Sequence, residues 1–183
     1  MSLLQGERSE SALIVIDVQV GVVAEAFERD LRIANINLAL DKARTHKIPV
    51  IWVQHSDEEM PIDSPEWQIV PELQPLPSEP IVRKTFRNSF EGTNFEEVLA
   101  GLKINHLYVC GAMTNNCVRH TSHAALERGY NVTLIADAHT TTGFEWKGYI
   151  VDAARVIDEQ NTNFFEDLPG RSADVKKVAD LWN

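Results

Sequence analysis

Short apolar runs separated by longer amphipathic segments constrain the fold of this chain more than any other feature of its sequence. The runs cover residues 12–18, 50–53, 106–112 and 131–138, and each has the length of one strand. Continuous hydrophobicity is typical of strands that are buried on both faces. The sequence therefore predicts an α/β fold: a doubly wound, mostly parallel sheet with helices on both faces, in three layers.

The segments between these runs are predicted to be helices. Residues 31–45 place apolar side chains at helical spacing, and residues 115–128 have the same pattern. Thr93 and Glu96 form a capping-box pattern, which predicts a helix that runs to about Lys103. Strands that alternate with helices are joined by right-handed crossovers, so neighbouring strands should be parallel.

The rest of the chain gives weaker signals. We expect a short strand at residues 81–82, a helix near residues 147–159 and a weak strand around residues 163–165. Ser172 is the expected N-cap of a last helix. These elements complete the sheet and its two helical layers.

Length and charge favour one cytoplasmic domain. We take residues 1–183 as a single domain with residues 1–10 as a flexible N-terminal tail, because this length is ordinary for one domain. A count of 17 Lys and Arg against 27 Asp and Glu gives a net charge of −10, which argues against nucleic acid or a membrane as partner. No apolar run approaches the ~20 residues that span a bilayer, and the N-terminus lacks a signal-peptide pattern.

The segment 56–80 contains six of the eight prolines and few small residues. It is expected to be an ordered, meandering loop, because a loop of this length is uncommon without a role. Two interpretations stay open: an excursion packed on the surface, and a wall or lid of a pocket.

Three reactive side chains follow predicted strands: Asp17, Lys84 and Cys117. Ligands bind at the carboxyl ends of parallel strands, so this is where a site is expected. Cys117 lies near the start of a helix, and we expect the helix dipole to lower its thiol pKa. Each residue also has a structural interpretation: a small buried cysteine, a solvated lysine, a turn aspartate. Position alone leaves both interpretations open.

Several sequence blocks resemble one known family. The segment GAMTNNCVRHTSHAALERGYNVTLIADA, residues 111–138, resembles the signature of the isochorismatase-like cysteine hydrolases. ALIVIDVQ, residues 12–19, resembles the family's first strand with its aspartate. VRKTFRNSFEGTNFEEVLAGL, residues 82–102, resembles the block that bears its lysine. In order and spacing, the resemblance covers most of the chain from residue 12 to about residue 140.

The resemblance implies an enzyme that hydrolyses a C–N bond of a small amide, carbamoyl or ureido compound through an acyl-enzyme thioester. Cys117 would be the nucleophile, Asp17 the general base and Lys84 the cation that holds the pair in order. The resemblance also implies a cis peptide bond between Ala112 and Met113, and an oxyanion hole formed by the N–H groups of Met113 and Cys117.

The resemblance is incomplete at the metal site of the nicotinamidases in this superfamily. Those enzymes carry a D-x-H pattern after the second strand, where this chain reads Gln54, His55, Ser56 and Asp57. We therefore expect no metal, and we expect nicotinamide to be disfavoured as substrate. The chain has neither a GxGxxG motif nor a P-loop, so no other cofactor is expected.

Substrate contacts are predicted at Val22, Phe86 and Asn116 by analogy with the family, and at Trp67 from its place in the long loop. Each of these residues could equally be part of ordinary packing. The family resemblance also implies a homo-oligomer, a dimer or tetramer. A second functional hypothesis remains: a catalytically silent scaffold that binds a small ligand or forms oligomers. A redox role is poorly supported, because Cys110 and Cys117 do not form a CxxC motif.

Overall fold

The computed structural model describes residues 8–182, apart from the side chains of residues 166 and 167. Its main feature is a seven-stranded sheet with the strand order β3-β2-β1-β4-β5-β9-β8, in which all neighbours are parallel except β8 and β9. The strands are β1 (Glu10–Ile16), β2 (Val50–His55), β3 (Ile81–Lys84), β4 (Ile104–Ala112), β5 (Asn131–Thr140), β8 (Glu166–Leu168) and β9 (Arg171–Lys176). The predicted doubly wound α/β fold is confirmed.

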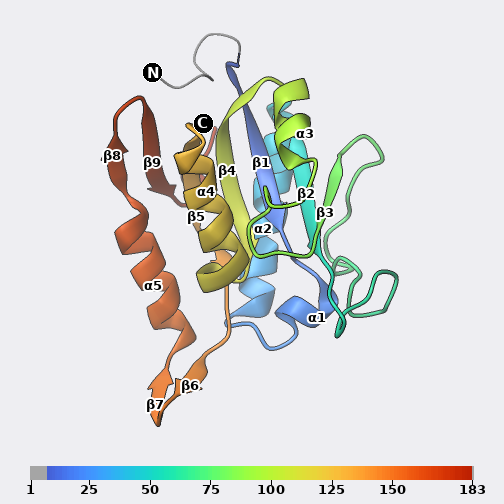
Figure 1. The fold of residues 1–183 in the computed structure, drawn as a ribbon, viewed down its shortest axis with the longest axis vertical. Helices are drawn as coiled ribbons and strands as arrows, with labels where there is room; N and C mark the ends of the chain where they lie inside the picture. Colours follow the sequence, from blue (N-terminus) through green and yellow to red (C-terminus); the bar gives the residue numbers. More distant parts are fainter. Residues whose placement is uncertain (1–7, 183) are drawn as a thin grey trace.

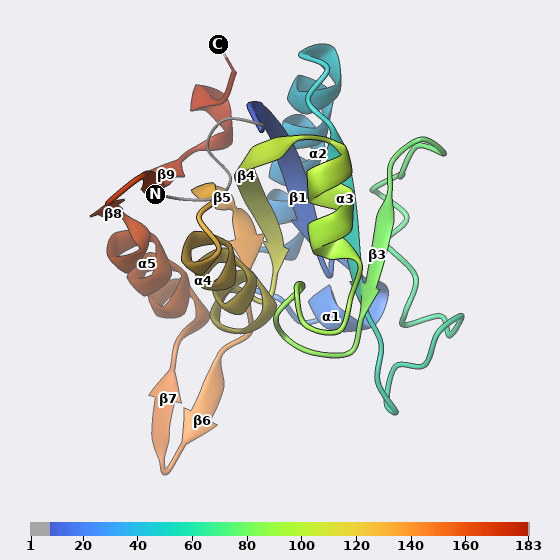
Figure 2. The same cartoon turned by 45° about the horizontal axis from the view of Figure 1, so that its top comes forward.

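Helices cover both faces of this sheet, as Figures 1 and 2 show. The longest helix, α2, lies behind the sheet, and α3, α4 and α5 lie in front of it. The helices are α1 (Val20–Val23), α2 (Arg29–Thr45), α3 (Phe95–Gly101), α4 (Arg119–Glu127) and α5 (Ala153–Phe164). A short π-helix, η1 (Thr114–Val118), precedes α4, and a 3-10 helix, η2 (Val178–Asp180), lies near the C-terminal end.

Two hydrophobic cores, one on each face, hold these layers together. Alternate residues of β1 divide between them: Leu13 and Val15 pack with α2, whereas Ile14 and Ile16 pack in the core that contains Phe95 of α3. Burial of each such aliphatic side chain contributes about 1.5 to 3 kcal/mol. The sheet position that carries Asp17 is therefore fixed from both sides.

The predicted helix start at Thr93 and Glu96 is only partly right. Helix α3 begins at Phe95, and Thr93 Oγ1 accepts a hydrogen bond from the Phe95 N–H at 3.1 Å. Glu96 does not complete a capping box. Its carboxylate instead accepts hydrogen bonds from the Tyr130 hydroxyl at 2.6 Å and from Arg8 at 3.1 Å. A contact between distant elements thus replaces the local one.

The predicted helix near residues 147–159 is wrong in its first part. Residues 144–151 form a hairpin of β6 (Phe144–Trp146) and β7 (Tyr149–Val151), and α5 begins only at Ala153. Asp152 caps this helix through a hydrogen bond from the Ala154 N–H to Oδ1 at 2.7 Å.

The weak strand predicted at residues 163–165 is also wrong, because α5 continues to Phe164. The last helix predicted from Ser172 is instead strand β9, which pairs in parallel with β5 and buries Ala173. Pairing with a distant strand decides this segment, and a local N-cap pattern does not reveal it.

The prediction of a flexible tail at residues 1–10 is wrong for its last residues. Glu10 begins β1, and Arg8 makes an ion pair with Glu96. The rest of that prediction, residues 1–7, lies outside the described residues. Within residues 8–182, no helix is long and apolar enough to cross a membrane.

The loop at residues 56–80 is ordered, as predicted. It lies against the segment that follows β1, where the Val70 N–H donates to Val18 O at 3.1 Å and the Gly21 N–H donates to Glu66 O at 2.8 Å. Gln19 is fully buried and donates to the carbonyls of His55 at 2.9 Å and Trp67 at 2.7 Å. The loop is thereby fastened to the chain directly after Asp17.

Candidate active site

The structure brings Asp17, Lys84 and Cys117 together at the carboxyl edge of the sheet. Asp17 directly follows β1, Lys84 ends β3, and Cys117 lies in η1 after β4. Lys84 Nζ lies 2.6 Å from Asp17 Oδ2 and donates a hydrogen bond to Cys117 Sγ at 3.2 Å. One ammonium group therefore contacts both the carboxylate and the thiol.

The ion pair between Asp17 and Lys84 is almost entirely shielded from solvent. The two residues are 1% and 2% exposed. Burial raises the pKa of Asp17, and the positive charge of Lys84 opposes this rise. A hydrogen bond with the Cys117 side chain also opposes the rise. A carboxylate with a raised pKa beside a thiol is suited to accept its proton.

The lowered thiol pKa expected for Cys117 is wrong. Burial raises the pKa of Cys117 to about 12, the negative charge of Asp17 adds to this rise, and the charge of Lys84 only opposes it. The expectation failed because burial and the neighbouring carboxylate act directly on the sulfur. Burial and the Asp17 carboxylate therefore favour the neutral thiol over the thiolate.

The turn that carries Cys117, residues 112–118, is called the cysteine turn below. Its Ala112–Met113 peptide bond is cis. The oxyanion hole itself, with the Met113 and Cys117 N–H groups, stays a prediction.

Gly111 allows β4 to approach β1 closely just before the cysteine turn. Its φ is +116°, and a Cβ at this position would lie 2.1 Å from Ile16 O. Only glycine fits here, because both the backbone conformation and the space exclude a side chain. The close approach sets Asp17, one residue after Ile16, beside the turn that carries Cys117.

Sequence reasoning missed the side chains that support the cysteine turn from β5. Thr114 Oγ1 lies 2.8 Å from His139 Nδ1, and Thr141 Oγ1 donates to Asn115 Oδ1 at 2.7 Å. Thr114, His139 and Thr141 are buried. Their positions near the end of a predicted strand were the only available signal, and that signal does not distinguish support from ordinary packing.

The four predicted substrate contacts lie in different surroundings. Asn116 is half-buried beside Cys117, and Val22 is half-buried against the core on the α2 face. Phe86 is 50% exposed. Trp67 is buried under the Arg83 guanidinium, 5.4 Å from the ring centre, and lines a cleft of about 490 Å³ whose lining does not include Asp17, Lys84 or Cys117. The contacts with substrate stay predictions.

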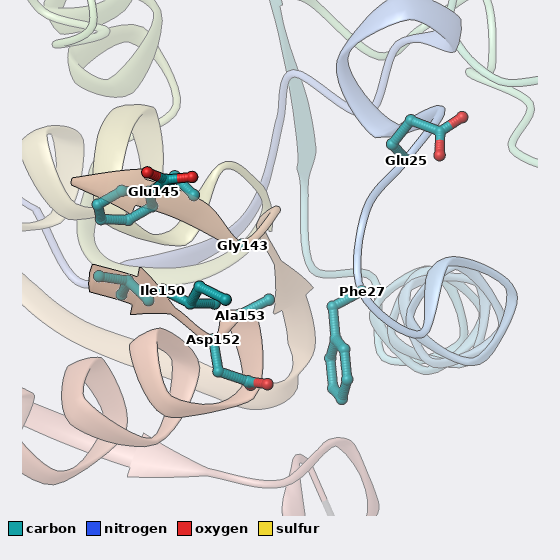
Figure 3. Close-up of a pocket in the computed structure, with 9 residues that line it drawn as sticks. Glu25, Phe27, Gly143, Glu145, Ile150, Asp152 and Ala153 are labelled. Carbon is teal, nitrogen blue, oxygen red and sulfur yellow. The ribbon is translucent and has the colours of Figure 1, made fainter. Parts of the chain in front are cut away.

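A second cleft opens at the carboxyl edge, between the β6–β7 hairpin and the segment after α1 (Figure 3). Its volume is about 460 Å³, and Phe27 points into it opposite Asp152. The Phe27 N–H donates to Thr141 O at 2.9 Å, and Thr140 Oγ1 donates to Phe27 O at 2.6 Å. The cleft is therefore attached to the same strand end that supports the cysteine turn.

The position of the nicotinamidase metal pattern holds a hydrogen-bonded pair. His55 Nε2 lies 3.1 Å from Asp57 Oδ2. Within residues 8–182, no group of three or more His, Cys, Asp or Glu side chains is arranged to hold a metal ion. Metal independence stays a prediction.

Comparisons with known proteins identify the family. Residues 11–164 match the isochorismatase domain family. A streptothricin hydrolase from Streptomyces noursei is 35% identical over 136 residues, which cover 71% of this chain and 49% of that protein. This chain thus spans about half the length of that curated relative.

A ureidoacrylate amidohydrolase, RutB of Agrobacterium fabrum, is 28% identical over 172 residues, covering 71% of this chain and 75% of that protein. Among solved structures, an isochorismatase from Pseudomonas putida KT2440 superposes with a TM-score of 0.85 at 30% identity. That superposition covers 95% of this chain and 92% of the other.

Proposed function

Because the chain belongs to the isochorismatase family, we propose that it is a cysteine hydrolase that cleaves a C–N bond of a small amide, carbamoyl or ureido compound. The observation that carries the proposal is the buried contact of Lys84 with both Asp17 and Cys117, at 2.6 Å and 3.2 Å. The names of two relatives, a streptothricin hydrolase and a ureidoacrylate amidohydrolase, support the choice of an amide-type bond.

The first half of the reaction forms a thioester. Cys117 Sγ attacks the carbonyl carbon, and its proton passes to Asp17 as the S–C bond forms. The carbonyl oxygen becomes an oxyanion, which the N–H groups of Met113 and Cys117 stabilise. Asp17 then gives the proton to the departing nitrogen, the C–N bond breaks, and the amine or ammonia leaves.

The second half releases the acyl group. Water adds to the thioester carbonyl while Asp17 takes one of its protons. The C–S bond breaks, the sulfur regains that proton, and the carboxylic acid leaves. The raised pKa of Asp17 suits it to both directions of transfer, because it is a stronger base than an exposed carboxylate.

Lys84 has the role of holding the proton donor and acceptor in one place. Its positive charge stabilises the thiolate as the proton leaves and offsets part of the cost of the buried Asp17 carboxylate. This matters because burial and the charge of Asp17 both raise the pKa of the Cys117 thiol, and the charge of Lys84 opposes that rise.

The test is amine or ammonia release from a panel of simple amides, N-carbamoyl amino acids and ureido acids. We expect turnover by the native protein and a loss of about 1,000-fold or more in Cys117→Ala. Cys110→Ala is the matched control, because Cys110 is a fully buried thiol on β4 whose Sγ lies 3.5 Å from Ile14 O. Intact-mass analysis after rapid quenching should find the acyl adduct on Cys117.

Two results would overturn the proposal. Undiminished turnover in Cys117→Ala would exclude this nucleophile. Complete inertness toward the panel, together with a Cys117 that resists both acylation and alkylation, would favour the silent scaffold that binds a ligand or forms oligomers.

A further inference from the structure

We propose that His139 is a positioning residue for the cysteine turn, which fixes the Thr114 hydroxyl and, through it, the Met113 N–H that faces the reacting carbonyl oxygen. This inference rests on the proposed function for its purpose, since an oxyanion must form for the position of that N–H to matter. Its evidence is a chain of hydrogen bonds that runs from α5 through β5 to the cysteine turn.

The first contact joins His139 to the start of η1. Thr114 follows Met113 directly and is three residues before Cys117, so its peptide groups belong to the same turn as both proposed donors. Its hydroxyl lies 2.8 Å from His139 Nδ1. Thr114 and His139 are both 0% exposed, so water does not compete for this contact.

The second contact fixes the direction of the chain. Asn161 of α5 donates from Nδ2 to Ala136 O at 3.1 Å, which leaves its Oδ1 to face His139 Nε2 at 2.9 Å. His139 Nε2 must therefore carry the hydrogen, and Nδ1 must be the acceptor for the Thr114 hydroxyl. Burial lowers the pKa of His139 to about 4, so Nδ1 stays unprotonated at neutral pH.

An irregularity in β5 places His139 at this point. Val109 pairs with Leu134 and Gly111 pairs with His139, so one residue of β4 lies opposite residues 135–138 of β5. Carbonyl groups of this bulge are bound from both faces of the sheet: Ala136 O by Asn161 of α5, and Asp137 O by Asn35 of α2 at 2.8 Å. Bulges commonly redirect a side chain toward a site, and this one aims His139 at Thr114.

A positioning role and a merely structural role can be told apart, because a substitution that disturbs positioning slows only those reactions of Cys117 that pass through an oxyanion. Acylation of Cys117 by p-nitrophenyl acetate passes through an oxyanion: the S–C bond forms, the C–O bond to p-nitrophenolate breaks, and the thiol proton passes to Asp17. Alkylation by iodoacetamide displaces iodide from a saturated carbon and forms no oxyanion. The ratio of the two rates therefore reports on the oxyanion hole, after subtraction of the Cys117→Ala background.

Matched substitutions distinguish the contribution of His139 Nδ1 from that of His139 Nε2. In His139→Asn the amide oxygen replaces Nδ1 as acceptor for Thr114, and in His139→Gln the amide nitrogen replaces Nε2 and the Thr114 contact is lost. We expect Thr114→Val and His139→Gln to lower the acylation rate about 10- to 100-fold with alkylation within about twofold of native. Thr114→Ser and His139→Asn should retain acylation within about threefold, because the hydroxyl contact survives.

The double variant Thr114→Val/His139→Gln should be no slower than the worse single variant, because both remove one contact. Asn161→Ala should lower the acylation rate about 3- to 10-fold. Because Asn161 is half-buried, this variant still tests the proposal if the variants at the fully buried Thr114 and His139 fail to fold. Equal losses of acylation and alkylation, or no loss of either, would overturn the positioning role. Inertness of the native protein toward the amide panel would bear on the proposed function alone, because p-nitrophenyl acetate and iodoacetamide still measure the acylation ratio. A Cys117 that resists both of these reagents as well would overturn the proposed function.

Discussion

Two regions at the carboxyl edge of the same sheet are built in opposite ways. Asp17, Lys84, Thr114 and His139 are each no more than 2% exposed and are linked by short polar contacts. The β6–β7 hairpin extends beyond the sheet at the same end (Figure 1), and Phe144, Trp146, Tyr149 and Ile150 are 45% to 87% exposed. At this edge, polar groups are buried and apolar groups are exposed. The buried polar cluster should therefore dominate both stability and chemistry, and the hairpin should contribute little to either.

The largest effect should come from Lys84→Met, which leaves Asp17 as a buried carboxylate without its counter-ion. We expect a loss of about 3 to 5 kcal/mol in the free energy of unfolding at neutral pH, together with loss of turnover. Chemical denaturation measures the first. Lys147→Met is the matched control in the hairpin, where the ammonium lies 5.4 Å from the exposed Trp146 ring.

The pH dependence of that variant has a definite sign. Without Lys84, the pKa of Asp17 in the folded state rises further above 3.8, so the folded protein retains a proton that the unfolded chain releases. Stability should fall as pH rises from about 4 through the raised pKa. Asp17→Asn in the Lys84→Met background should recover much of the loss. A variant that is equally unstable at pH 5 and pH 8 would contradict a buried charge as the cause.

The next effect concerns His139, whose pKa is lowered from 6.5 to about 4 by burial. As the pH falls, the unfolded chain binds this proton at a higher pH than the folded protein does. The contribution of His139 to the free energy of unfolding should therefore be fully present above pH 6.5 and decline as the pH falls toward 4. The contribution of this one group is about 3 kcal/mol over that range. Denaturation of His139→Asn from pH 7.5 to pH 4 should show a shallower decline.

His106, whose pKa is also lowered to about 4 by burial, titrates in the same range and remains in that variant. Some decline should therefore persist in His139→Asn. His46→Asn, at an exposed position, is the control that should leave the native profile unchanged. A profile in His139→Asn identical to the native one would show that His139 does not set the acid limit.

A smaller effect is expected from Thr141→Val, which removes the 2.7 Å hydrogen bond to Asn115 Oδ1. Stability should fall by about 1 kcal/mol, the usual net worth of one buried hydrogen bond. Thr142→Val, at the next and less buried position, should change stability by less. Thermal unfolding of the two variants side by side measures the difference, and equal changes would deny the hydroxyl a specific role.

The smallest effect should follow from Trp146→Ser/Tyr149→Ser in the hairpin. Both side chains are exposed, so the free energy of unfolding should change by no more than about 0.5 kcal/mol, and the acylation rate of Cys117 should not change. Light scattering of the native protein and of this variant gives the oligomeric state of each. A loss above about 1 kcal/mol that depends on protein concentration would mean that the hairpin is buried between copies of the chain.

The comparison also explains which features could be predicted from the sequence. Strands β1, β4 and β5 have continuous apolar runs, so the sheet and the positions of Asp17 and Cys117 after its strands follow from local pattern. The role proposed for Lys84 came from the family resemblance. These features depend on residues near each other in the chain.

The features that were missed depend on contacts between distant segments. Strand β9 exists through its pairing with β5, and the capping box was lost because Glu96 contacts Tyr130 instead. The direction of the Cys117 pKa shift was wrong because burial and a neighbouring carboxylate are tertiary properties. Thr114 and His139 are 25 residues apart in the sequence and meet where β4 and β5 end, so no local sequence pattern predicts their contact.

The position of β1 in the middle of the sheet has a consequence for synthesis of the chain. One edge of β1 pairs with β2 at residues 50–53, but its other edge pairs with β4 at residues 104–111. During translation, the second edge therefore remains open while some ninety further residues are made, as the interval from Ile16 to Ile104 implies. An apolar strand with an open edge is prone to pair with other chains. Once β4 has left the ribosome, it can pair with this open edge of β1. Because Cys117 follows β4 by only a few residues, the same pairing places Cys117 beside Asp17.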